Sequence, residues 1–451
     1  MPFIRFVIPL AGAMLLSACT GFAPRSDFAA QAEHQATQVP HWDTSVSGEP
    51  VGMLTDLIGS PELEALVREA FANNPGLQQT LLTLEKSRID LQITDSNRLP
   101  EASAGLAVDR TEDAATRYTG SVSVSWQVDL WRKLADGVRA AERDVAQQQA
   151  LLDGARDSLA AEVMLGWLGL IGEQRALAVE TARLATLELN TALILQRYRS
   201  GLGTLEDLDS ARSAEHSSRA TVVAGGEAVA RRQRSLLILL GRLSDEPVAL
   251  PAAYPDVVVP LANLPEQTLA RRPDLRAAYH AIVAADLRTR AAYKDLLPSL
   301  SLSAMLEDIA SSPAQALLTD PAWSLLGQLT APLFNGGRLK AEAQRQELNT
   351  AQAYQTYRET LLAAIGEIRD GLGREKALAE QQQHLELALQ HQRSNLARYQ
   401  QKYRSGGATI LELLSVQRET YDLEAQLDAL IHDRLANRVT LALALGLGAS
   451  E

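Results

Sequence analysis

The sequence predicts an α+β membrane protein in which one unit of helices and strands occurs twice. Three observations support this prediction. The tetrapeptide Tyr-Arg-Ser-Gly begins at Tyr198 and again at Tyr403, 205 residues later. The hydrophobic period changes from 3.6 to 2 at one place in each half. Only 5% of the 451 residues are aromatic, while Ala, Leu and Gln are abundant, and this composition favours long helices.

Other pairs of segments show that the whole chain is duplicated. The segment "NNPGL" (73–77) corresponds to "RRPDL" (271–275) at an offset of 198 residues, and Leu240-Gly241 corresponds to Leu445-Gly446 at an offset of 205. The seven extra residues lie between about residues 105 and 337. We therefore expect a first repeat over 61–243, a Pro-rich linker over 244–263, and a second repeat over 264–451.

The N-terminus has the pattern of an export signal. Arg5 precedes a short apolar run, and "LSAC" (16–19) follows it. This tetrapeptide resembles a bacterial lipobox, in which Cys19 becomes the lipidated first residue of the mature protein. Residues 1–18 are then a signal peptide, and 19–60 form a lipidated N-terminal segment. Thr20, in place of an aspartate, indicates the outer membrane.

Each repeat is expected to contain the same elements in the same order. A first helix starts at a proline, a β-hairpin follows, and a very long helix then reverses into a shorter return helix. The hairpins are expected at 101–130 and 299–333, the first helices at 75–98 and 273–296, the long helices at 133–197 and 338–402, and the return helices at 205–240 and 410–445.

The expected strands alternate apolar with polar residues, most clearly over 121–130, more weakly over 101–109, and with one break at Leu326 in the second copy. Val122, Val124 and Trp126 point to one face, while serines at the intervening positions point to the other. Four strands of about ten residues cannot close a barrel, and lipid permits no open sheet edge. Oligomerisation has to close the sheet, and three chains supply the twelve strands that leave an open lumen.

The long helices measure about 100 Å at about 1.5 Å per residue. They end at "RSGLGT" (199–204) and "RSGGAT" (404–409), where glycine can adopt the left-handed conformation that terminates a helix. The apolar residues of the return helices recur at spacings of four and seven, a pattern typical of coiled coils.

Together, the lipobox, "DLWRKL" (129–134), "PLFNGGRL" (332–339) and the paired turns resemble the TolC-type outer-membrane efflux protein family, in its lipidated, drug-exporting branch. The resemblance implies a TolC-like fold: four transmembrane β-strands per chain, a twelve-stranded barrel in a homotrimer, and a long periplasmic α-helical coiled-coil barrel continuous with it. It also implies a passive exit duct in the outer membrane, loaded by an inner-membrane pump through a periplasmic adaptor.

The resemblance assigns two sets of residues. Asp207 and Glu412 match positions that narrow the periplasmic entrance as a gate, although a solvated acid one turn into a helix is the alternative. Ala408 and Ser415 replace an arginine and an acid of the family's best-known member, so the closing latch differs here. The adaptor-docking turns, for which plain helix reversal is the alternative, contain Arg199, Ser200, Gly201, Gly203, Arg404, Ser405, Gly406 and Gly407.

Other classes of function have less support. The formal charge of −12 argues against a nucleic-acid partner. The sequence contains no HExxH, GxSxG, P-loop or CxxC motif, so we expect no enzyme, catalytic residue, metal or cofactor. A duct for protein secretion shares the same fold, and a lipid-anchored periplasmic coiled-coil scaffold remains a structural alternative. The sequence does not identify the transported substrates or the partner pump.

Overall fold

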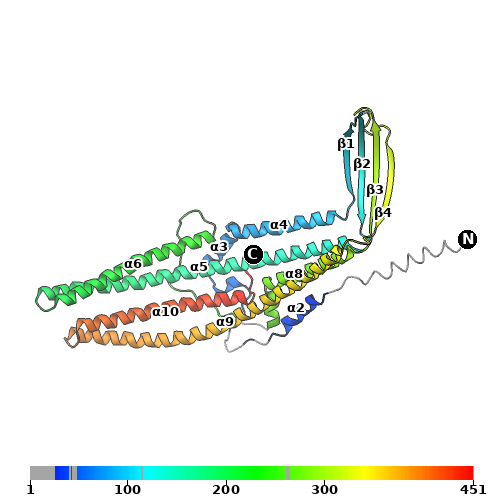
Figure 1. The fold of residues 1–451 in the computed structure, drawn as a ribbon. Helices are drawn as coiled ribbons and strands as arrows, with labels where there is room; N and C mark the ends of the chain where they lie inside the picture. Colours follow the sequence, from blue (N-terminus) through cyan, green and yellow to red (C-terminus); the bar gives the residue numbers. More distant parts are fainter. Residues whose placement is uncertain (1–25, 40–41, 43–47, 113–114, 261–264, 450–451) are drawn as a thin grey trace. The chain divides into compact units, whose positions relative to one another are not determined.

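The computed structural model describes residues 26–39, 42, 48–112, 115–260 and 265–449 (Figure 1). The predicted signal peptide and Cys19 lie outside the described residues. The first repeat contains α4 (Pro75–Ser96), α5 (Lys133–Arg199) and α6 (Leu205–Leu239), and the second contains α8 (Pro273–Lys294), α9 (Arg338–Arg404) and α10 (Ile410–Ala444). Each of these helices ends within two residues of the position expected from the sequence. Among the described residues, no helix is apolar over a long enough stretch to cross a membrane.

Some short elements were not expected from the hydrophobic period. They are α2 (Phe28–Thr37), the 3₁₀ helix η1 (Leu54–Leu57), α3 (Pro61–Asn73) and α7 (Pro265–Arg271). Ser60 caps α3 by accepting a hydrogen bond from the amide of Leu63 at 3.3 Å, and Pro61 occupies the first helical position. In the described part of the linker, residues 244–260 contain no helix or strand, and Pro260 forms an isolated bridge with Glu49.

The four strands form one antiparallel sheet in the order β1-β2-β3-β4. They are β1 (Glu101–Asp109), β2 (Arg117–Val128), β3 (Ser299–Ala310) and β4 (Ala322–Thr330). The central pairing of β2 with β3 joins the hairpins of the two repeats into one sheet. Val122 lies opposite Ala104 and Leu306, so the apolar face predicted for β2 continues across its neighbours. Within one chain, β1 and β4 each have one unpaired edge.

The inserted residues of the second repeat lie in its hairpin and in the connection from the hairpin to α9. Strand β3 has 12 residues, whereas β1 has 9. The loop between β3 and β4 spans 311–321, and the loop between β1 and β2 spans 110–116. Because β4 is as much shorter than β2 as β3 is longer than β1, the longer loop leaves the second hairpin four residues longer. The connection from the hairpin to the long helix, 331–337 against 129–132, adds the other three of the seven residues that separate the two offsets. Both long helices, in contrast, have 67 residues, and both return helices have 35.

The chain divides into two compact units that do not coincide with the two repeats. Unit 1 contains the sheet and comprises the chain up to Gln38, Leu81–Leu151 and Asp274–Leu361. Unit 2 contains both helix reversals and comprises Val39–Thr80, Leu152–Pro273 and Leu362–Glu451. Each unit takes segments from both repeats, so the boundary between the units does not follow the boundary between the repeats.

Inside unit 1, the N-terminal helix α2 packs on α8 and α9. The ring of Phe28 stacks on that of Tyr354 with centroids 4.9 Å apart, and the hydroxyl of Tyr357 donates to the carbonyl of Ala32 at 3.2 Å. Tyr279 donates to the Glu33 carboxylate at 2.6 Å. This hydrogen bond, together with burial, raises the pKa of Tyr279 to about 12. Helix α2, which lies in the predicted lipidated N-terminal segment, is therefore attached to unit 1.

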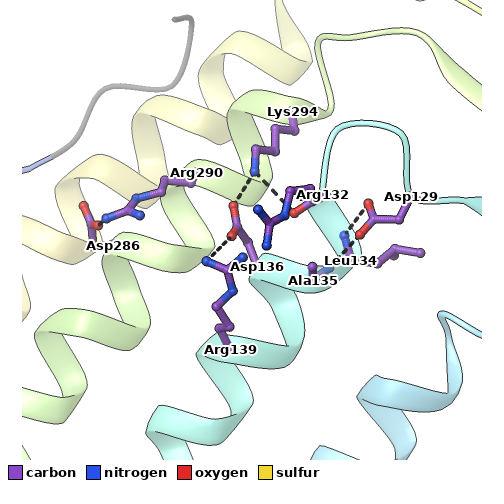
Figure 2. Close-up of polar contacts among 9 residues, drawn as sticks. All are labelled: Asp129, Arg132, Leu134, Ala135, Asp136, Arg139, Asp286, Arg290 and Lys294. Atoms are coloured by element: carbon purple, nitrogen blue, oxygen red, sulfur yellow. Dashed lines mark hydrogen bonds and ion pairs between the residues drawn. The ribbon is translucent and has the colours of Figure 1, made fainter. Parts of the chain in front are cut away.

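The junction between β2 and α5 is stabilised by charged side chains (Figure 2). Asp129 accepts hydrogen bonds from the amides of Leu134 at 3.0 Å and Ala135 at 2.8 Å, so it caps the first turn of α5. Arg132 has a φ of 61°, where the second repeat has Gly337 with a φ of 83°. Lys294 of α8 donates to the carbonyl of Arg132 and to the buried Asp136. The second repeat therefore forms this left-handed turn with glycine. The first repeat forms it with an arginine whose carbonyl accepts a hydrogen bond from Lys294.

Unit 2 has its core between the long helices and the return helices. Trp167, Leu168 and Ile171 of α5 are fully buried. A Cβ atom at Gly166 would lie 3.2 Å from Cδ1 of Leu236, so the glycine permits close approach of α6. A tight contact of the same kind lies in the second repeat, where a Cβ at Gly371 would lie 3.0 Å from Leu441 of α10.

Candidate functional site

The two helix reversals have the same backbone hydrogen bonds. In the first, the amide of Gly201 donates to Tyr198 O at 3.0 Å, and the amide of Leu202 donates to Arg197 O at 2.9 Å. In the second, the amide of Gly406 donates to Tyr403 O at 3.1 Å, and that of Gly407 to Lys402 O at 2.8 Å. The bond that spans six residues defines a Schellman motif, in which the residue after the helix is left-handed. The repeated sequence therefore encodes a repeated helix terminator.

The four glycines of these turns differ in what they contribute. Gly201 and Gly406 have φ values of 71° and 75°, a conformation in which any side chain is strained, although space around both is open. Gly203 is confined, because a Cβ there would lie 3.3 Å from the amide nitrogen of Tyr198. Gly407 is not confined, because the nearest atom to its Cβ position is 3.6 Å away. Helix reversal thus accounts for Gly201 and Gly406, while it does not require glycine at Gly407.

The two acids that we expected at a gate take part in the caps of the return helices. The hydroxyl of Thr204 accepts from the amide of Asp207 at 3.1 Å, and the Asp207 carboxylate accepts from the amide of Thr204 at 3.3 Å. Thr409 and Glu412 form the same reciprocal pair, at 3.3 Å and 2.7 Å. Such a capping box has a sequence signature, threonine followed three residues later by an acid, which the sequence analysis did not use.

The hydrogen bonds of the second capping box affect the acidity of Glu412. The backbone amide of Thr409, and then its hydroxyl at 2.8 Å, hold the pKa of Glu412 below its usual value of 4.5. Lys402, at the end of α9, contributes to the same lowering. Among the described residues of one chain, neither Asp207 nor Glu412 forms an ion pair with Arg199 or Arg404. Both carboxylates are held by their own helix termini.

The two reversals lie at the same end of unit 2. Ile194 of α5 forms a buried apolar cluster with Leu208 and Ala211 of α6. Ile410 and Leu414, from the first turn and a half of α10, pack against this cluster. The second return helix therefore starts beside the first reversal. The structure brings together the predicted turn residues of both repeats through an apolar contact that carries no charge.

A series of polar pairs connects α5 with α10 further along the two helices. Arg183 contacts Asp422 at 2.7 Å, the hydroxyls of Thr186 and Tyr421 lie 2.8 Å apart, and Asn190 donates to Gln417 at 2.8 Å. We name these three contacts the α5–α10 polar pairs. Their partners are 227 to 239 residues apart in the sequence, so no local pattern could have predicted them. They join the first repeat to the second close to the predicted entrance.

A groove of about 490 Å³ runs between α5, α6 and α10 beside these pairs. Its walls include Leu187, Ser218 and Leu411 as well as the polar-pair residues Arg183 and Tyr421. The hydroxyl of Ser218 is buried and has no hydrogen-bond partner among the described residues. The three helices thus leave a groove lined by both apolar and polar side chains here, in place of a closed apolar core.

Comparison with known proteins identifies the family. A family model described as "Outer membrane efflux protein" matches residues 66–242 and 264–447, one segment in each repeat. The chain belongs to the outer membrane efflux protein family. OprJ of Pseudomonas aeruginosa is 29% identical over 379 residues, which cover 80% of this chain and 78% of OprJ. The pyoverdine export protein OpmQ of Pseudomonas putida is 26% identical over 407 residues, 86% of each chain.

Solved structures of outer-membrane proteins have the same fold. A membrane protein from Pseudomonas aeruginosa superposes with a TM-score of 0.83 at 25% identity, over 91% of this chain and 99% of the other. The outer membrane channel CmeC of Campylobacter jejuni gives 0.82 at 19% identity, over 92% of this chain and 94% of CmeC. The predicted TolC-like fold class is therefore confirmed.

Proposed function

We propose that this protein is the outer-membrane channel of a tripartite efflux pump, a passive exit duct for drugs or other small molecules. One observation carries the proposal: each matched segment of the family model contains one hairpin of the sheet and one helix reversal. The protein is located in the outer membrane, as are its relatives. The family consists of efflux channels and not of enzymes. Because the relatives are named for pyoverdine export and cation efflux, efflux is favoured over protein secretion.

The channel requires more than one chain, and we propose a homotrimer. The free edges of β1 and β4 are complementary, because antiparallel pairing of β4 with β1 of the next chain continues the order of the sheet. Three copies close a sheet of twelve strands with the serine face inside and the apolar face toward lipid. A sheet with open edges in lipid, or a scaffold with an exposed apolar sheet in water, is unfavourable.

The turns are the proposed contact for the periplasmic adaptor, which in turn binds the inner-membrane pump. Arg199, Ser200, Arg404 and Ser405 lie at the helix ends, and open space surrounds Gly201 and Gly406. A bulky substitution at either glycine is expected to weaken adaptor binding. The family also supports lipid anchoring at Cys19, since one relative, from Salmonella typhimurium, is named a probable outer membrane lipoprotein.

Three copies of Asp207 and Glu412 bring six carboxylates to the proposed entrance. Because like charges repel and attract cations, the ring is expected to favour cations over anions. The capping boxes hold each carboxylate beside the first turn of its own helix. The positions of these charges therefore do not require an arginine in place of Ala408 or an acid in place of Ser415. We further propose that the α5–α10 polar pairs hold the closed entrance together.

The function is tested with the purified full-length protein. Light scattering, corrected for detergent, is expected to give a trimer, and planar bilayers are expected to show discrete conductance. In cells that lack their own outer-membrane channel, co-expression with a cognate adaptor and pump should restore export of a fluorescent dye. A monodisperse monomer that forms no channel would contradict the proposed architecture.

The gate is tested with variants that remove the negative charges of Asp207 and Glu412 and keep the size and shape of the side chains. The double variant Asp207→Asn with Glu412→Gln keeps the capping geometry and is expected to raise anion permeability and to alter the closed-state conductance. The matched control, Thr204→Ala with Thr409→Ala, keeps both charges while it removes the cap hydroxyls, and its ion selectivity should stay unchanged. If the charge variant keeps the trimer and the original selectivity, the two acids serve only as caps.

A further inference from the structure

The apolar face of the sheet carries one charged residue among the strand residues that the structure describes. Direct cross-strand pairing puts Gly120, Val122, Val124 and Trp126 of β2 on the same face as Asp308, Leu306, Ala304 and Leu302 of β3. The rest of this face is built from Ala, Leu, Val, Tyr, Trp and Gly. An uncompensated carboxylate on a face toward lipid is costly, so the surroundings of Asp308 require an explanation.

The loop between β3 and β4 supplies that explanation. The Asp308 carboxylate accepts hydrogen bonds from the amide of Thr319 at 2.8 Å, from its hydroxyl at 3.2 Å and from the amide of Asp320 at 3.1 Å. Asp308 is only 7% exposed as a result. Three hydrogen-bond donors from one loop therefore compensate the carboxylate of Asp308 on the apolar face.

The same loop crosses the neighbouring strand. Gly120 is the cross-strand partner of Asp308, and a Cβ there would lie 1.8 Å from the carbonyl oxygen of Ala316. Ala316 is fully buried in this contact. Leu318 has a φ of 58°, a strained conformation for leucine. The loop is therefore folded down against the apolar face and cannot at the same time cover the serine face.

The side chain that the loop presents outward is apolar. Leu317 is 69% exposed and follows directly after the buried Ala316. Leu306 precedes Asp308 by two residues and lies on the same face of β3. Its cross-strand partner in β4 is Trp323, which is 78% exposed. Exposed tryptophans near strand ends are typical of the level where a membrane meets water.

We propose that the β3–β4 loop, residues 311–321, is a lipid-binding apron that lies on the outer surface of the membrane, with Leu317 inserted among the lipids of the outer leaflet. This inference rests on the proposed function, which directs the apolar face to lipid and the strand tips to the cell exterior. The apron fixes the depth of the sheet in the membrane and leaves the serine-lined mouth free of this loop. The four residues by which this loop exceeds the loop of the first hairpin provide its reach.

Fluorescent labelling of single cysteines in lipid vesicles tests the apron. Leu317→Cys, Leu325→Cys and Ser125→Cys are labelled with an environment-sensitive fluorophore, and the wild-type chain gives the background from Cys19. Nitroxide groups attached to phospholipid near the headgroup are expected to quench labels at 317 and 325 at least about threefold more than the label at 125. Aqueous iodide should show the reverse order.

Two results overturn the inference in distinguishable ways. If lipid nitroxide quenches the label at 325 and iodide quenches the label at 317 as strongly as that at 125, the loop lies in water and the apron is wrong. If lipid nitroxide quenches neither 317 nor 325, the apolar face is not in lipid, and the proposed function fails as well. A second variant tests the contact itself: Gly120→Val is expected to displace the loop and abolish lipid quenching at 317 while it preserves quenching at 325. Gly105→Ala, a glycine of the same sheet without a close backbone contact, is the matched control.

Discussion

Helices α4 and α8 occupy the same place in the two repeats, yet their apolar residues have different surroundings. Ile89 of α4 and Leu287 of α8 are equivalent positions at the offset of 198 residues, and they are 51% and 6% exposed. Five residues earlier, Leu84 and Ile282 are also equivalent, and both are buried. The two helices thus share one buried face, but only α8 has its second apolar side covered within the chain.

The exposed side of α4 is a continuous stripe. Successive residues of an α-helix are rotated by about 100°, so Leu82, Ile89 and Ile93 share one face that lies roughly opposite Leu84. All three are exposed in the single chain. A helix that is apolar on two opposite sides is suited to a position between two partners. In the proposed trimer, this stripe is therefore the expected contact of α4 with a second chain, whereas the equivalent side of α8 is part of the core of its own chain.

The largest effect is expected in α8. Leu287→Ala should lower the free energy of unfolding by about 2–5 kcal/mol, because it leaves a cavity in unit 1. Ile89→Ala, at the equivalent position, should cost less than about 1 kcal/mol in a chain held monomeric, because its side chain is already exposed. Thermal or denaturant unfolding followed by circular dichroism measures both. An equal loss of unfolding free energy in the two monomeric variants would show that Leu287 and Ile89 do not differ in their surroundings within the chain.

The next effect is expected on assembly. Ile89→Asp together with Ile93→Asp should convert the trimer to monomers while helix content is retained, because the carboxylates would be buried without partners in the contact. Light scattering and circular dichroism on the same sample measure the two quantities. Arg88→Ala, an exposed residue of the same helix outside the stripe, is the control. A stable trimer of the double variant would show that the stripe faces something other than a second chain.

The turns should behave alike in the two repeats, in contrast to α4 and α8. Gly201→Ala and Gly406→Ala should each cost about 1 kcal/mol, because each places a side chain on a left-handed residue. Gly407→Ala should be nearly neutral, since nothing there requires glycine. Unfolding of each variant is compared with that of the wild type. A cost at Gly201 and none at Gly406 would break the equivalence of the two reversals.

The smallest effect concerns the cap of α10 at low pH. The pKa of Glu412 is lower in the folded state than its usual value of 4.5, so its contribution is present above that pH and is lost as the pH falls through the lowered pKa. A spin label at Ala408→Cys should therefore become more mobile as the pH falls below about 4.5. Glu412→Gln in the same background should remove the pH dependence. A change of equal size in the Gln variant would assign the effect to another group.

Local features of the chain were predictable because local physics determines them. Prolines mark the starts of α4 and α8, period-2 alternation marks the four strands, and glycines mark the reversals. The short helix α7 was missed because its seven residues are too few to show a period. Asp207 and Glu412 were predicted as acids of the entrance, a role that stays a proposal, while their capping bonds escaped notice.

Contacts between distant segments could not be predicted. The α5–α10 polar pairs join residues of the two repeats, and a single sequence carries no signal for which arginine meets which aspartate. The folding of the 311–321 loop onto Gly120 depends on one glycine in β2 and one acid in β3, and each of them alone is unremarkable. The division into compact units is likewise a property of packing, because both units combine segments from both halves.

The equal lengths of the duplicated helices constrain how this gene can change. With 67 residues in both α5 and α9, and 35 in both α6 and α10, the two reversals end side by side at the Ile194 and Leu208 cluster. Each residue inserted into one long helix would shift its turn by about 1.5 Å and rotate it by about 100° relative to the other. Helix-length mutations are therefore tolerated only when both halves change together in near-integral turns. The hairpin loops, where the halves already differ, remain free to vary one at a time.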